Sequence, residues 1–227
     1  MFSSKLNSRR IVHYIYSIFT MIYTFIYLKI KLMAMASISF TNELMRKGIH
    51  LTSILIILVY AFFGKQETQT LLIVYLVLIM IIEHLRLDRG IKLPVFHILL
   101  RQKEKSGIGS HVYFTLGALV AVSVFSKNIA FAAILMTTFG DMSAALIGKR
   151  FGKIRIFGNG KSLEGCISEF IVDIFIVVLL IQNPFVSVFM AFVATYVETT
   201  FVKIDDNIAI PVFSGAFAEL AFLLIPH

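Results

Sequence analysis

Long apolar runs alternate with short polar segments along nearly the whole chain. Each run is close to the roughly 20 residues that a helix needs to cross the hydrocarbon core of a bilayer. The runs cover residues 11–28, 48–64, 68–85, 110–126, 128–148, 166–182, 185–202 and 208–225. The pattern predicts an all-α fold, a polytopic integral membrane protein with seven or eight transmembrane helices.

The first run, 11–28, supports more than one interpretation. It follows Lys5, Arg9 and Arg10, as the apolar part of a cleaved signal peptide would. The run is long for that purpose, and Lys29 and Lys31 separate it from the small residues that a signal peptidase prefers. We therefore predict a retained anchor or an interfacial helix here.

Composition agrees with a membrane protein and excludes a soluble one. Hydrophobic residues make up 58% of the 227 residues, charged residues make up 15%, and the mean hydropathy is +0.88. Soluble domains have about 25% charged residues. Seven or eight spans use most of the chain, so a separate soluble catalytic domain has no room. The single Cys166 excludes an intramolecular disulfide, and its apolar neighbours predict a buried, inert thiol.

Positive charge is confined to certain loops. The net charge is +8, and the segments 29–50, 86–109 and 149–165 hold four, six and five Lys or Arg residues. The connections near 64–70, 127 and 183–184 hold almost none. The positive-inside rule therefore places the charged loops in the cytoplasm. Nucleic-acid binding is a poorer explanation, because no basic run lies away from a membrane flank.

Two groups of ionisable residues lie at predicted helix ends. The first follows helical spacing i, i+3, i+4 and i+7, which places its members on one stripe; it consists of Glu43, Arg46, Lys47 and His50. Interface anchoring is the alternative to a functional role. The second is Glu83 with Arg86 one turn later, for which a structural ion pair and a functional role are equally open.

A buried acid precedes a loop rich in glycine and cations. Asp141 follows Gly140 well inside the 128–148 run, and acids at such depth are functional by default. The loop suits polyphosphate, because glycines expose backbone N–H groups and cations bind phosphate oxygens. Its candidate residues are Lys149, Arg150, Gly152, Lys153, Gly160, Lys161, Ser162, Glu164 and Gly165. The loop lacks the Walker A spacing, and a merely positive-inside loop is the alternative.

A third polar group follows the run 185–202. Glu198 lies one turn before its end, and Asp205, Asp206 and Asn207 precede the last run. Hard oxygen ligands in this number suit Mg²⁺, although capping of the last helix would use the same residues. Glu169, Asp173 and Glu219 are further acids inside apolar runs whose roles the sequence leaves open.

The charge-derived topology brings these groups to one membrane face. Carboxylates for Mg²⁺ beside cations for phosphate, at the boundary of water and lipid, suit phosphoryl transfer from a nucleotide to a lipid, which depends mainly on positioning and charge neutralisation. The segment 1–42 is then an N-terminal anchor or interfacial helix with its linker, and 43–227 is a membrane-embedded catalytic domain.

Four strings, taken together, resemble the motifs of the membrane-integral dolichol kinase, phytol kinase and CTP-dependent diacylglycerol kinase family. They are ELMRKGIH (43–50), GDMSAALIGKRFGK (140–153), GKSLEG (160–165) and VETTFVKIDDNIAIP (197–211). The resemblance implies a lipid-alcohol kinase that uses CTP as phosphoryl donor with Mg²⁺, acting on a lipid such as a polyprenol or dolichol. Partners would be the lipid, the nucleotide and the membrane but no nucleic acid, and a homodimer is compatible with the sequence.

The resemblance also implies roles for individual residues. We expect Asp141, Glu198 and His50 to be catalytic, Asp141, Asp205, Asp206 and Asn207 to hold the metal, and the glycine-rich loop with Arg46 and Lys47 to bind phosphate. One departure is that the acids Glu169 and Asp173 follow GKSLEG, where this family often has small residues.

Two alternatives remain open on the sequence. A phosphatidate cytidylyltransferase would need the same kinds of residues. An ion- or proton-coupled transporter would use the buried acids, although paired repeats with broken helices are not visible. The acceptor could also be phytol or diacylglycerol.

Overall fold

The computed structural model describes residues 53–90, 104, 106–156, 160–201 and 203–224. The stripe formed by Glu43, Arg46, Lys47 and His50 lies outside the described residues, and so does the run 11–28. The division between 1–42 and 43–227 and the roles expected of that stripe stay predictions.

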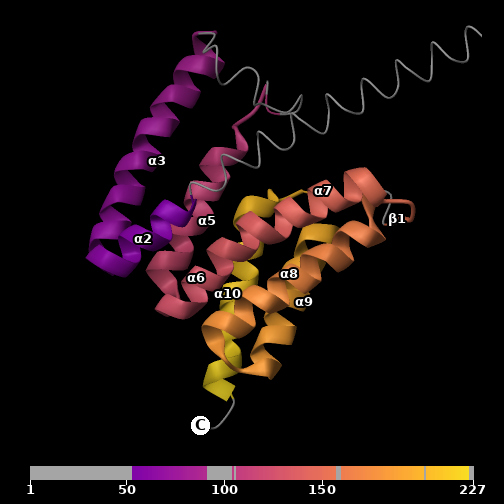
Figure 1. Ribbon diagram of the computed structural model, residues 1–227. Helices are drawn as coiled ribbons and strands as arrows, with labels where there is room; N and C mark the ends of the chain where they lie inside the picture. The colour runs from indigo at the N-terminus through magenta and orange to yellow at the C-terminus, as the bar shows by residue number, and fades with distance from the viewer. Residues whose placement is uncertain (1–52, 91–103, 105, 157–159, 202, 225–227) are drawn as a thin grey trace, which may run out of the picture. The chain divides into compact units, whose positions relative to one another are not determined.

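The described chain is mostly helical, as the sequence predicts. Its helices are α2 (Ser53–Phe63), α3 (Lys65–Asp88), α5 (Ser110–Val124), α6 (Lys127–Leu135), the π-helical turn η2 (Met136–Gly140), α7 (Asp141–Phe151), α8 (Leu163–Ile181), α9 (Pro184–Thr200) and α10 (Asp206–Leu224) (Figure 1). These elements follow the predicted apolar runs closely. Several boundaries differ from the predicted runs by three residues. Helix α3 extends beyond 68–85 at both ends, α8 begins before 166, and the helix predicted to end at 148 continues to Phe151.

A two-stranded hairpin corrects the all-α prediction. Strands β1 (Arg155–Ile156) and β2 (Lys161–Ser162) pair antiparallel between α7 and α8, with Arg155 opposite Ser162. This hairpin has no signal in the sequence pattern, since strands of two residues are too short for an alternating pattern.

Three described helices are long and apolar enough to cross a membrane. They are α3, the continuous helix Lys127–Phe151 that joins α6, η2 and α7, and α10. Helices α2, α5 and α9 are apolar but shorter, and α8 carries three acids among its 19 residues. These helices support the prediction of a membrane protein. The number of seven or eight spans stays a prediction.

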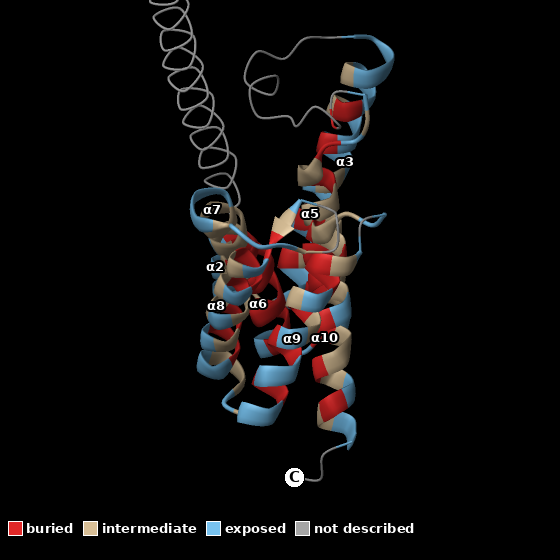
Figure 2. Ribbon diagram, turned by 90° about the vertical axis from the view of Figure 1, so that its right-hand side faces the viewer, coloured by how far each residue is buried: buried red, intermediate tan, exposed pale blue. Residues whose placement is uncertain are grey.

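The core lies where α6 meets its neighbours. Every residue from Ile129 to Ile134 is buried, three of the six are Ala, and these small side chains let helices pack closely around α6. Figure 2 shows buried residues gathered in α6 and on the facing sides of the surrounding helices. Large apolar side chains on the outer face of α3 are exposed, as expected for a surface in contact with lipid.

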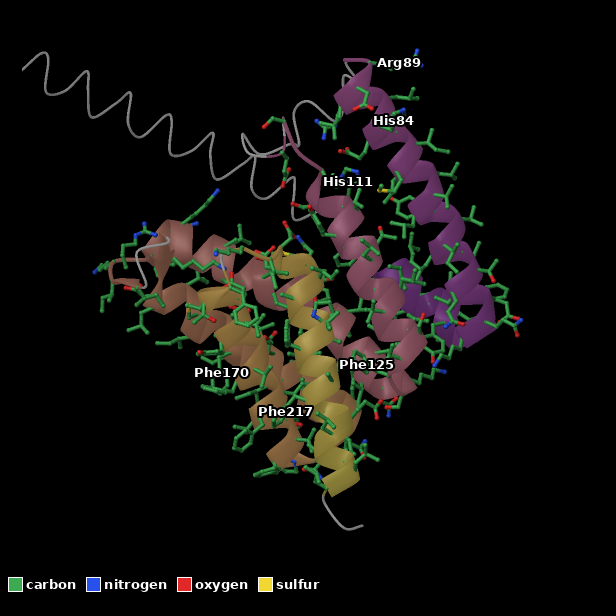
Figure 3. The ribbon with its side chains drawn as sticks, turned by 180° about the vertical axis from the view of Figure 1, so that it is seen from behind. His84, Arg89, His111, Phe125, Phe170 and Phe217 are labelled. Carbon is green, nitrogen blue, oxygen red and sulfur yellow. The ribbon has the colours of Figure 1, made fainter. Side chains whose placement is uncertain are left out.

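Glu83 ties α3 to the start of α5. Its side chain is 2% exposed; Oε2 accepts hydrogen bonds from Arg86 Nη2 at 2.5 Å and from the Gly109 N–H at 3.2 Å. His111, labelled in Figure 3, lies in the first turn of α5 with Nε2 3.4 Å from Glu83 Oε1. The geometry therefore supports the structural interpretation of Glu83, which links two helix ends.

Glu219 also has a structural contact. Its Oε1 accepts the backbone N–H of Ser126, the residue that caps the start of α6. The first N–H groups of a helix lack intrahelical partners, so a carboxylate from α10 stabilises this helix end.

Candidate active site

Three carboxylates from three different helices meet at one point. Asp141 begins α7, Glu198 lies near the end of α9, and Asp206 begins α10. One carboxylate oxygen from each lies within 4.8 Å of those of the other two, and Asp141 and Glu198 are 5% and 6% exposed. Like charges this close require a compensating cation or proton. We name Asp141, Glu198 and Asp206 the carboxylate cluster.

Lys161 supplies positive charge beside the cluster. Its Nζ lies 2.6 Å from Glu198 Oε1 and also donates a hydrogen bond to the Glu198 carbonyl oxygen. The other carboxylate oxygen, Glu198 Oε2, is buried and has no hydrogen-bond partner among the described residues. A buried carboxylate oxygen without a hydrogen-bond partner is what we expect of a side chain that binds a metal ion.

A π-helical turn sets the direction of Asp141. The turn η2 interrupts the Lys127–Phe151 helix and ends at Gly140, so Asp141 is the first residue of the resumed α-helix. An inserted π turn rotates the following residues relative to the preceding ones, and such turns are frequent at functional sites. Gly140 is packed tightly, because a Cβ there would lie 2.2 Å from Asp173 Oδ1 on α8.

Glycines bring α7 and α8 into close contact beside the cluster. A Cβ on Gly165 would lie 2.8 Å from the Ala144 carbonyl oxygen and 3.3 Å from Gly148 Cα. Ser162 Oγ accepts the Gly165 N–H at 3.2 Å and caps α8. The Gly148 and Gly165 positions therefore place the β2 strand, and with it Lys161, against the end of α7.

The hairpin is held by Arg155 and Glu164. Arg155 Nη1 donates to the Gly160 carbonyl oxygen at 2.5 Å, and Gly160 has a φ of 83°, which glycine tolerates best. Glu164 Oε1 accepts the N–H of Lys153 at 2.9 Å. That backbone N–H lowers the pKa of Glu164, which is half-buried and lies before the predicted span 166–182. Glu164 therefore stays ionised and fastens the loop.

A pocket of about 280 Å³ opens beside the carboxylate cluster. Eight predicted site residues line it: Asp141, Lys149, Gly160, Lys161, Ser162, Gly165, Glu198 and Asp206. Gly148, which was not predicted as a site residue, lines it as well. Sequence reasoning missed Arg155, which also lines the pocket; its only signal was its place among the loop cations. Cys166 lines the pocket too, is buried as predicted, and has its Sγ 3.3 Å from Thr199 Oγ1.

Other predicted residues lie outside this pocket. Arg150 is exposed in the last turn of α7, and Lys153 is exposed on the loop that follows. Gly152 is needed where α7 ends, because a Cβ there would lie 2.2 Å from the Gly148 carbonyl oxygen. Asp205 Oδ1 accepts from Asn207 Nδ2 at 2.7 Å, so these two residues organise the start of α10. Their parts in phosphate or metal binding stay predictions.

The residues of the cluster fit a hard divalent cation. Mg²⁺ prefers oxygen ligands, usually takes only one or two protein carboxylates, and keeps water or substrate phosphate in its remaining positions. Asp141, Glu198 and Asp206 offer carboxylate oxygens at an open pocket, with one Glu198 oxygen still unsatisfied. The neighbouring cations Lys149, Arg155 and Lys161 would repel a bare metal but attract a nucleotide–metal complex.

Comparison with known proteins supports the resemblance to lipid kinases. The chain is similar to CTP-dependent diacylglycerol kinase 1 of Schizosaccharomyces pombe, 24% identical over 140 residues that cover 54% of this chain and 64% of that protein. CTP-dependent diacylglycerol kinase 1 of Saccharomyces cerevisiae is 26% identical over 149 residues, covering 61% and 45%. An uncharacterised protein of Methanocaldococcus jannaschii is 29% identical over 178 residues, covering 75% and 89%.

The chain matches less than two thirds of the length of either yeast kinase. No family model matches the chain, and no solved structure does. Similarity to dolichol and phytol kinases stays a prediction from the motifs.

Proposed function

We propose that this chain is a CTP-dependent kinase that phosphorylates the hydroxyl group of a membrane lipid. The observation that carries the proposal is the carboxylate cluster, in which acids from three separate helices meet beside Lys161 at one pocket. Acids for a metal and cations for phosphate in one place are what phosphoryl transfer requires.

The pocket residues fall into two groups, cations for the phosphates and carboxylates for the metal. Lys161, Lys149 and Arg155 line the pocket and would bind the nucleotide phosphates, and Gly160 and Ser162 line the same space. The carboxylate cluster would hold the metal of the nucleotide. A Mg²⁺ ion bound there would neutralise charge on the phosphates. Close packing of α7 and α8 at Gly148 and Gly165 holds the cations of the pocket next to the carboxylate cluster.

The acceptor proposed here is diacylglycerol. The named relatives are diacylglycerol kinases that depend on CTP, and this supports diacylglycerol over the polyprenol or dolichol favoured by the sequence. The proposal for CTP as donor has the same support. The residues of the pocket do not by themselves distinguish nucleotide bases.

A donor and acceptor panel tests this proposal. Purified protein in lipid vesicles would be incubated with CTP, ATP, GTP or UTP and with diacylglycerol, a polyprenol or phytol, and lipid phosphates would be measured by mass spectrometry. We expect phosphatidate from CTP and diacylglycerol at the highest rate. If no acceptor were phosphorylated with any of the nucleotides, the proposal of a kinase would be contradicted. If polyprenyl phosphate were the main product, the proposal of diacylglycerol as acceptor would be contradicted.

We also propose that the site faces the cytoplasm, because the segment 149–165 holds five cations. Lys153 is exposed and lies outside the pocket, so a cysteine there should react with a membrane-impermeant thiol reagent only after cells are opened. The comparison uses Cys166→Ser protein with Lys153→Cys, which has a single thiol. Labelling of intact cells would place the loop on the opposite side.

A further inference from the structure

A groove between three helices is lined mainly by apolar side chains. Its volume is about 400 Å³, and its walls include Leu55 and Val59 on α2, Leu72 and Tyr75 on α3, and Phe114 on α5. Figure 1 shows α3 beside α5, with α2 against the lower part of α3. The volume falls in the range of roughly 300–1,000 Å³ that is usual for small-molecule sites.

The groove opens to the surroundings of α3. Leu55 and Tyr75 are exposed, whereas Leu72 is buried. Since α3 is long and apolar enough to cross a membrane, these surroundings are the hydrocarbon of the bilayer. An empty groove would lose the dispersion contacts of its lining, so we expect a hydrocarbon chain to fill it.

The polar residues of the groove leave it apolar except at one end. Thr68 and Thr115 line it, but each donates its hydroxyl hydrogen to a backbone carbonyl oxygen one turn earlier, at 2.7 and 2.8 Å. His111 lies in the first turn of α5, with Nε2 3.4 Å from Oε1 of Glu83 near the end of α3. A chain in the groove would therefore have its polar end at His111, beside the charged segment 86–109.

The groove also begins close to the carboxylate cluster. The hydroxyl oxygens of Ser53, at the start of α2, and Thr138 are hydrogen-bonded at 2.8 Å. Thr138 precedes Asp141 by three residues, and Ile56, three residues after Ser53, lines the groove. This hydrogen bond and two steps of about one helical turn, roughly 5 Å each, separate the groove wall from Asp141. The glycerol and ester groups of a lipid can bridge such a span.

We propose that this groove holds one acyl chain of the acceptor lipid and places the hydroxyl group of that lipid at the carboxylate cluster. The inference rests on the proposed function, because it takes the acceptor to be diacylglycerol. The groove has a limited volume, so it sets which chain lengths the enzyme accepts. Val59, half-buried in its α2 wall, is a specificity-determining residue.

Chain-length preference tests the groove. Val59→Trp places a larger side chain in it, and Val77→Trp makes the same change at an exposed position of α3 outside it. The value of kcat/KM would be measured in detergent micelles with dioleoylglycerol and with dioctanoylglycerol. We expect the ratio of the two values to fall by about 10-fold in Val59→Trp, because the longer chain loses its space, and to stay at the parent value in Val77→Trp. An unchanged ratio in Val59→Trp, or an equal loss with both lipids, would overturn the proposal.

Photo-crosslinking of the parent needs neither a variant nor turnover. Purified protein in micelles without nucleotide would be irradiated with a diacylglycerol that carries a diazirine in one chain, and the modified peptides would be identified by mass spectrometry. We expect adducts around Val59 and Leu72 that excess dioleoylglycerol removes and excess phosphatidylcholine does not. Adducts spread evenly over the apolar helices would overturn the proposal. Equal competition by phosphatidylcholine would also overturn it, because the groove would then hold a bilayer phospholipid. Adducts at the groove in a protein that phosphorylated no lipid would contradict the kinase and still support the lipid site.

Discussion

Asp141→Asn is expected to abolish lipid phosphorylation while the protein stays folded. The substitution keeps the volume of the side chain and removes one of three charges that meet within 4.8 Å. Because metal binding to hard oxygen ligands depends on carboxylate charge, we expect the turnover number to fall by at least about 100-fold. The measurement is transfer of phosphate from CTP to diacylglycerol in vesicles, together with the thermal unfolding temperature.

The matched control is Asp88→Asn. Asp88 is an exposed acid at the end of α3 whose Oδ2 lies 2.9 Å from His84 Nδ1. This variant should keep the parent rate, since the same chemical change occurs away from the cluster. Asp206→Asn should retain some activity at a higher Mg²⁺ concentration. Near-parent rates for Asp141→Asn across a range of Mg²⁺ would show that the cluster is structural.

Lys161→Ala is expected to impair both binding of CTP and turnover. Lys161 lines the pocket and contacts Glu198, so its removal takes away a phosphate contact and also leaves the buried Glu198 carboxylate unpaired. We expect the KM for CTP to rise and kcat/KM to fall by about 100-fold, which corresponds to roughly 2.7 kcal/mol of transition-state stabilisation. Steady-state kinetics with varied CTP measure both values.

Lys65→Ala is the control for lost charge, because Lys65 begins α3 and does not line the pocket. It should leave the KM for CTP unchanged. Parent-like kinetics in Lys161→Ala would place the phosphate site elsewhere and would leave Lys161 as only an ion-pair partner of Glu198.

Sequence patterns predicted the described helices well because the apolar runs from 68 onward each map onto one continuous helix, 128–148 onto Lys127–Phe151. They predicted Asp141, Glu198 and Asp206 for a related reason, since acids are rare in apolar runs and at their ends. Their meeting point depends on tertiary packing. The π turn before Asp141 and the close approach of Gly148 and Gly165 have no signature in residue spacing, so the sequence could not give the geometry.

The sequence does not distinguish which of two neighbouring residues with similar chemistry belongs to the site. Asp205 and Asp206 are adjacent acids, yet only Asp206 joins the cluster, because the direction of α10 at its first turn points one carboxylate inward. Arg155 was missed, since it enters the pocket through a hairpin too short to be predicted. The roles of Glu219 and Glu83 could not be predicted from the sequence, because these side chains accept hydrogen bonds from backbone N–H groups far away in the chain.

Transfer of the γ-phosphate of CTP to a lipid hydroxyl is tested by following two phosphates of CTP in parallel. Protein in diacylglycerol-containing vesicles would be incubated with CTP labelled at the γ-phosphate or at the α-phosphate, and the extracted lipid would be counted, with Asp141→Asn as the blank. We expect γ-label in the lipid and none from the α-position. Label from the α-position in the lipid, or no γ-label above the blank, would contradict phosphoryl transfer from CTP to a lipid hydroxyl.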